Sequence, residues 1–128
     1  MALTGTVKGV TYYKITTAGA EDWAVDVTDQ NGNIVSEMVI EVVTTAGACN
    51  LFLPAISTLN NFWNTKITVI GLTGAANAVN VKAYTSAVPP LVETNTIGSA
   101  AQLVLNTNKM TTELNVASSL VWYAVKTA

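Results

Sequence analysis

The residues that could perform chemistry in this chain are few, and the absence of histidine is the first fact to note. Histidine is the commonest general base and the commonest metal ligand in proteins. With no histidine and one cysteine, a single chain cannot build a zinc centre or a catalytic triad of the serine or cysteine type. No glycine-rich loop leads from a strand into a helix, so a phosphate-binding loop is not expected either.

Eight carboxylates remain as candidates for acid–base chemistry. Glycoside hydrolysis needs two of them facing each other across a cleft. Four of the eight cluster within residues 21–29, around a predicted surface hairpin where charge keeps a loop hydrated. Glu93 and Glu113 stand apart in polar stretches. We therefore interpret the carboxylates as a charged rim and expect no catalytic residues and no enzyme.

One short segment has a pattern that loosely resembles a calcium loop. Asp29, Asn31 and Asn33 fall at alternate positions. In an EF-hand the glycine follows the third ligand, whereas Gly32 precedes it here, and no glutamate follows at the right distance. Asn31-Gly32 also suits the positive φ angles of a tight hairpin turn. A hairpin turn is the preferred interpretation, and we expect no metal and no other cofactor.

The single cysteine, Cys49, lies in an apolar stretch and is interpreted as a small buried hydrophobic residue, not a reactive thiol. Four aromatic residues are candidates for surface contacts: Phe62, Trp63, Tyr84 and Trp23. The first two lie in residues 55–64, where a loop with about one helical turn is predicted. Two interpretations stay open, since these rings could cap the core or form a flat platform on which a sugar stacks.

Composition limits the classes of partner. Only 11% of the 128 residues are charged, against about 25% in an average soluble domain. A surface of hydroxyl, amide and methyl groups fits a fixed assembly better than a free enzyme. The net charge is −2 and there is no arginine, which argues against nucleic acid. No apolar run approaches the roughly 20 residues of a membrane span, and the first residues do not resemble a signal peptide.

The strand pattern is organised around residues 39–55. A β-branched run at 39–43 is joined by small residues at 44–48 to an apolar run that stops at Pro54. This predicts a β-hairpin or a sharp strand corner, with both runs in the middle of a sheet covered on both faces. The last run, residues 120–125, is apolar on both faces and is also predicted to be central.

The chain as a whole reads as one all-β domain spanning residues 1–128. About eight to nine short strands separated by turns predict an antiparallel β-sandwich or a jelly-roll-like barrel. Residues 6–15 are predicted as a first strand with a bulge at Gly9, and residues 101–126 as a closing meander. Residues 1–22 would form an N-terminal docking arm or an edge strand.

A series of strand and turn motifs follows in a fixed order from about residue 40 to residue 126. They are Val43-Thr44-Thr45, Asn50-Leu51-Phe52-Leu53-Pro54, Lys66-Ile67-Thr68-Val69-Ile70, Asn77-Ala78-Val79-Asn80-Val81, Asn95-Thr96-Ile97-Gly98-Ser99 running to Leu103, Leu114-Asn115-Val116 and Trp122-Tyr123-Ala124-Val125. Together they resemble a β-sandwich module of tailed-bacteriophage virion proteins. The chain departs from that pattern at Asn95, where the family usually has Asp, and at Ser118-Ser119-Leu120, where Ser-Asp-Gly usually precedes the Trp.

The resemblance implies a sandwich that assembles, often as a trimer, on a phage particle. Members of the family are head decoration proteins, head fibres and tail-fibre tips. We therefore expect a capsid decoration or head-fibre subunit in the virion, made in the host cytoplasm. Its partners would be copies of itself and the major capsid protein. The chain has no heptad, collagen-like or repeat segment to form a shaft, which favours the head over a long tail fibre. The alternative is a tail-fibre or spike tip that binds a host surface glycan.

Overall fold

The computed structural model of the chain describes residues 3–7, 10–28, 34–59, 65–72 and 77–127. Within these residues the chain forms β-strands and one short 3-10 helix, so the all-β class is confirmed. The elements are β1 (Leu3–Val7), β2 (Val10–Thr16), β3 (Glu21–Ala24), β4 (Glu37–Val43), β5 (Cys49–Phe52), η1 (Ile56–Thr58), β6 (Lys66–Leu72), β7 (Val79–Lys82), β8 (Thr96–Ile97), β9 (Gln102–Leu105), β10 (Met110–Ser118) and β11 (Val121–Thr127).

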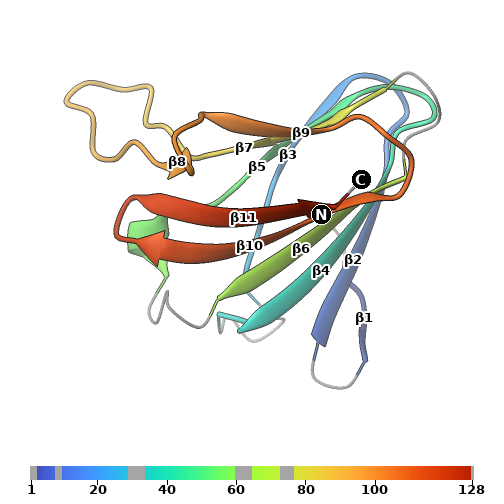
Figure 1. The fold of residues 1–128 in the computed structure, drawn as a ribbon, viewed down its shortest axis with the longest axis horizontal. Coiled ribbons are helices and arrows are strands. Elements are labelled where there is room, and N and C mark those ends of the chain that lie inside the picture. The colour runs from blue at the N-terminus through green and yellow to red at the C-terminus, as the bar shows by residue number, and fades with distance from the viewer. Residues whose placement is uncertain (1–2, 8–9, 29–33, 60–64, 73–76, 128) are drawn as a thin grey trace.

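The strands form two sheets (Figure 1). One has the order β1-β2-β4-β6-β10-β11-β8 and the other has the order β3-β5-β7-β9. From β2 to β7 the chain alternates between the sheets, and neighbours are parallel: β2, β4 and β6 in one sheet, β3, β5 and β7 in the other. Successive coils of the chain therefore stack on one another in a β-solenoid-like arrangement.

The pairing is mixed, not antiparallel throughout as the sequence pattern suggested. Antiparallel pairs join β1 to β2, β6 to β10, β10 to β11 and β7 to β9. Inward and outward side chains alternate in the same way in parallel and antiparallel strands, so the hydrophobic pattern does not specify strand direction. The predicted closing meander is present only as the β10–β11 hairpin, because β9 belongs to the other sheet.

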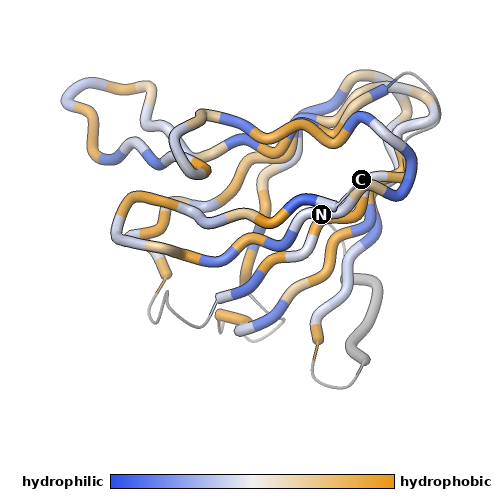
Figure 2. The backbone as a smooth tube through the Cα atoms, in the orientation of Figure 1, coloured by the Kyte–Doolittle hydropathy of each residue, from blue (hydrophilic) through white to orange (hydrophobic). Residues whose placement is uncertain are grey.

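Residues 39–55 form a corner between the sheets. β4 lies between β2 and β6, and β5 lies between β3 and β7, so the predicted corner is correct and the predicted hairpin is wrong. Both strands are central in their sheets, as predicted. They are fully covered on one face only: Ile40 and Leu51 are buried, whereas Val39 is half-buried and Phe52 is exposed. The inward side chains of both sheets pack into one hydrophobic core, and Figure 2 shows the resulting alternation along the strands.

The first and last strands of the chain, which lie toward the two ends of the seven-stranded sheet, differ from what the sequence predicted. The predicted strand over residues 6–15 is two antiparallel strands, β1 and β2, and Gly9 lies outside the described residues. β1 is an edge strand, and a docking role for residues 1–22 stays a prediction. β11 is not central along its length, because β8 pairs only with Val121 and Trp122. Beyond that point Tyr123 and Val125 are exposed.

A repeated five-residue segment makes the corners of successive coils. The segment Thr-Thr-Ala-Gly-Ala occurs at residues 16–20, from the last residue of β2 to the start of β3, and again at residues 44–48, between β4 and β5. Buried Thr17 donates from Oγ1 to the carbonyl oxygen of Gly47 (2.7 Å), and buried Thr44 donates to that of Asn77 (2.6 Å). Each threonine thus ties one coil to the next. The repeat marks the solenoid-like stacking, and it is visible in the sequence itself.

Candidate functional site

The candidate site lies on the outer face of the four-stranded sheet, where β3, β5 and β7 end. Ala24, Phe52, Lys82 and Gln102 are in register across the four strands. The Lys82 Nζ lies 5.8 Å from the centre of the exposed Phe52 ring, within range of a cation–π contact. This row forms one side of a hollow whose other residues come from the segments that follow β3, β5 and β7 and from Ala101, just before β9.

This hollow, here called the groove, has a volume of about 650 Å³, within the size range of small-molecule sites. Most of its lining is apolar, and Lys82 is the only charged residue among the described residues that line it. The lining residues are Ala24, Val25, Phe52, Leu53, Pro54, Ala55, Thr58, Lys82, Ala83, Tyr84, Thr85, Ala101 and Gln102. A second hollow of about 380 Å³ shares Val25, Pro54 and Thr58 with the groove, so the two adjoin. Asp26 lies in this second hollow.

Of the four aromatic residues predicted as surface contacts, the structure places Tyr84 in the groove. Trp23 is half-buried against the core, and its indole Nε1 donates to Glu21 Oε1 (3.0 Å). Phe62 and Trp63 lie outside the described residues. Sequence reasoning missed Phe52. The sequence signal for Phe52 is the polar residue Asn50, because side chains two positions apart in a strand lie on the same face of the sheet.

A projecting loop adjoins the groove. Residues 86–93, here called the finger, lie between β7 and β8 and extend beyond β8 at the upper left of Figure 1. The Ser86 N–H donates to the Glu93 carbonyl oxygen (3.0 Å), which closes the base of the finger. Val88, Leu91 and Val92 are 73%, 62% and 83% exposed, and hydrophobic segments are visible in this loop in Figure 2. The finger therefore presents an apolar surface to solvent.

Two buried polar side chains fix the finger to the body of the protein. Glu93 Oε1 accepts hydrogen bonds from Asn95 Nδ2 (2.6 Å) and from the Ser57 N–H (3.3 Å). Asn95 Oδ1 accepts from the Ile56 N–H (3.0 Å) at the start of η1. Glu93 is thus a buried structural residue and not part of a charged rim. An amide both donates and accepts, so Asn95 can do here what an ionised Asp could not.

The charge state of Glu93 follows from these contacts. Burial by itself would raise the pKa of the carboxyl group, because the charged form loses hydration. The hydrogen bonds from Ser57 and Asn95 outweigh that effect and hold the pKa of Glu93 below its ordinary value. The base of the finger is therefore stabilised by a carboxylate that stays ionised at neutral pH.

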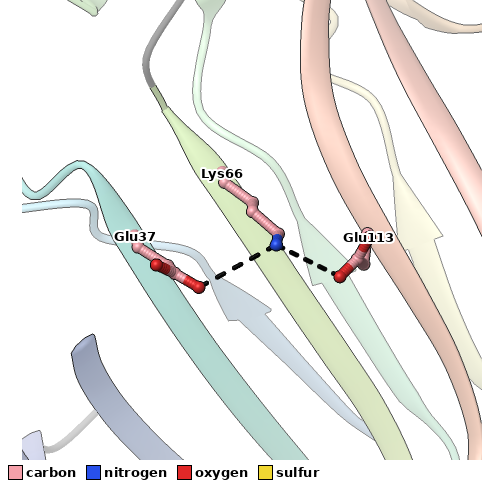
Figure 3. Close-up of polar contacts among 3 residues, drawn as sticks. All are labelled: Glu37, Lys66 and Glu113. Carbon is pink, nitrogen blue, oxygen red and sulfur yellow. Dashed lines mark ion pairs between the residues drawn. The ribbon is translucent and has the colours of Figure 1, made fainter. Parts of the chain in front are cut away.

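Several other carboxylates within the described residues make local structural contacts. On the outer face of the seven-stranded sheet, Lys66 Nζ lies 3.2 Å from Glu113 Oε1 and 3.9 Å from Glu37 Oε1 (Figure 3). Such partly exposed pairs contribute little to stability. On the four-stranded sheet Asp22 accepts from Asn50, which in turn accepts from Asn80. Among the described residues no three His, Cys, Asp or Glu side chains are placed to hold a metal ion. The loosely calcium-like residues 29–33 lie outside the described ranges.

Comparison of the chain with known protein families, curated protein sequences and solved structures finds no match. Within the part of the chain that the structure describes, no helix has the length and apolarity required to cross a bilayer. A functional proposal therefore rests on the sequence motifs and on the exposed surfaces of the fold.

Proposed function

We propose that the chain is a non-enzymatic structural protein of a bacteriophage particle, specifically a capsid decoration or head-fibre subunit. In this proposal it assembles, as a trimer, through contacts with copies of itself and binds the major capsid protein. It would reside in the virion after synthesis in the host cytoplasm. The order of strand motifs from residue 40 to residue 126 supports the family.

The observation that carries the proposal is the apolar surface left exposed on a chain with little charge. The finger exposes Val88, Leu91 and Val92, and β11 exposes Tyr123 and Val125. Proteins that remain single in solution rarely expose contiguous apolar surface without using it for contact. With 11% charged residues, the chain also has little charge with which to keep copies apart.

The open edges of the seven-stranded sheet support the same proposal. β1 forms one edge, and β11 beyond Trp122 has no described strand on its outer side. Exposed edges pair readily with strands of another chain. The finer fold belongs to the proposal as well: we take the two layers as a sandwich of mixed pairing, in which stacked coils are closed by the β10–β11 hairpin.

The experiment that tests this function measures the molar mass of the purified protein and its binding to phage particles. We expect an oligomer at micromolar concentration, and saturable binding to particles of the virus that encodes the chain. A protein that stays monomeric and does not bind the particles would overturn the proposal. A reconstruction of the native particle would then locate the subunit and give its copy number.

The second candidate function is a tail-fibre or spike tip that binds a host glycan. The specific observation in its favour is that Tyr84 and Phe52 line one groove together with Lys82, Gln102 and two threonines. Sugars stack on aromatic rings and bond to neighbouring amides and hydroxyls. A glycan array tests this candidate: binding that is lost in Tyr84→Ala and kept in Tyr123→Ala would support it, and an array without hits would exclude it.

A further inference from the structure

We propose that the finger of one copy docks in the groove of a second copy of this chain. The inference rests on the self-assembly proposed above and names the two surfaces that would meet. Four observations carry it: the apolar, uncharged tip of the finger, its rigid base, the apolar groove, and the position of the groove directly beside the finger.

The tip of the finger is suited to burial. Residues 87–92 are Ala, Val, Pro, Pro, Leu and Val, with no charged or hydroxyl side chain among them. Val88, Leu91 and Val92 are exposed, so the finger does not occupy the groove of its own chain. Burying these side chains against another apolar surface would remove them from water, which is the main driving force for association.

The base of the finger is held in place before any partner binds. Glu93 and Asn95 connect it to η1 through hydrogen bonds that are largely buried. The Asn95 N–H also donates to the Tyr84 carbonyl oxygen (2.8 Å) across the base. A segment that is ordered beforehand loses less conformational entropy when it docks, so a small contact surface can suffice.

The groove matches the finger in polarity. Its described lining is mostly apolar, and the one charged group in that lining, Lys82, already lies over the Phe52 ring. An uncharged finger places no second positive charge near Lys82. It also carries no charge of its own that would need a partner in the groove. The groove volume of about 650 Å³ is ample for aliphatic side chains such as those of Leu91 and Val92.

Adjacency favours a second copy over an unrelated partner. Ala83, Tyr84 and Thr85 line the groove, and the finger begins at the next residue, Ser86. In every copy the finger and the groove therefore lie side by side. In the proposed trimer each copy can place its finger in the groove of the next copy around a closed ring, because every copy carries both surfaces. An unrelated partner would have to provide a matching projection and a matching hollow together.

Disulfide trapping tests the contact directly. Two single variants of the full chain, Val92→Cys and Gln102→Cys, carry tags of different mass and are mixed and oxidised. We expect at least five-fold more cross-linked heterodimer than from Leu120→Cys mixed with Gln102→Cys, since Leu120 is exposed but lies outside the finger. The native Cys49 is buried and does not compete. Equal yields from the two mixtures would overturn the proposal.

Sedimentation of a second variant separates this inference from the proposed function. Leu91→Ser with Val92→Ser changes only exposed side chains, and it should weaken self-association at least ten-fold, whereas Leu120→Ser should not. If wild type and the double variant associate equally, the finger contact is wrong while the assembly function stands. If the wild type is monomeric and the double variant loses only particle binding, the finger docks on a virion protein and the inference fails. Glycan binding in the groove that leaves self-association unchanged would also overturn it.

Discussion

Gly47 packs directly against the backbone of Gly19 at the corner where two coils stack. A β-carbon built on Gly47 would lie 2.1 Å from the Gly19 carbonyl carbon and 2.4 Å from its oxygen. No flexible side chain is involved, so the overlap could be relieved only by moving one coil relative to the next. The two glycines occupy the same position in the repeated segment, yet only Gly47 is enclosed.

This contact predicts opposite outcomes for two matched substitutions. Gly47→Ala should lower the free energy of unfolding by about 2 kcal/mol or more, because the backbone must shift. Gly19→Ala meets no atom within 4 Å. It should be neutral or stabilising by up to about 1 kcal/mol, because it restricts the unfolded chain. Urea denaturation measures both values. Equal effects would contradict the stacking of the two corners.

A second prediction concerns the threonines that join successive coils. Thr44→Val keeps the shape of the side chain but removes the hydroxyl that donates to the Asn77 carbonyl oxygen (2.6 Å) in a buried site. We expect a loss of about 1–3 kcal/mol, because the half-buried Asn77 carbonyl oxygen is left with one partner fewer. Thr45→Val, at the exposed neighbouring position, is the control and should change the stability little. Thermal denaturation of both variants distinguishes the two results.

A third prediction is a pH dependence centred on Glu93. The pKa of Glu93 is lower in the folded protein than its ordinary value of 4.5. The unfolded state therefore binds the proton more tightly. The stabilisation by Glu93 is complete above pH 4.5 and is lost as the pH falls through the lower folded value. Glu93→Gln should cost about 1–3 kcal/mol at neutral pH, and this difference should shrink as the pH falls below 4.5.

The control for that prediction is Glu113→Gln, which removes an exposed partner of Lys66. Surface pairs of this kind contribute at most about 1 kcal/mol, so its effect should be small across the same pH range. Chemical denaturation of the three proteins at several pH values measures the difference. A cost of Glu93→Gln that does not vary with pH would show that the ionised carboxylate is not what stabilises the base of the finger.

A fourth prediction is that the thiol of Cys49 does not react in the folded protein. Burial raises its pKa to about 11, with smaller contributions from the charges of Glu21 and Asp22. At pH 8 almost no thiolate forms, and the residue has no exposed surface. Labelling with a thiol reagent should be slow in buffer and fast in denaturant. Rapid labelling of the native protein would contradict the buried position of Cys49.

The sequence by itself determined the all-β class, the approximate positions of most strands and the corner at residues 44–48. These follow from local patterns, since β-branched residues, small residues and Pro54 act on their immediate neighbours. It also determined the buried state of Cys49, which lies in an apolar run. The Thr-Thr-Ala-Gly-Ala repeat was present as well, but only the structure shows that its two copies lie at stacked corners.

Only the tertiary structure decided which strands pair and in which direction, because inward and outward residues alternate in the same way in every pairing. It decided that Tyr84 and Phe52 share a groove, that Trp23 packs against the core, and that buried Glu93 accepts a hydrogen bond from the Ser57 N–H. These relationships join residues far apart in the chain. No local preference encodes them, because they arise when the two sheets close over one core and bring the segments together.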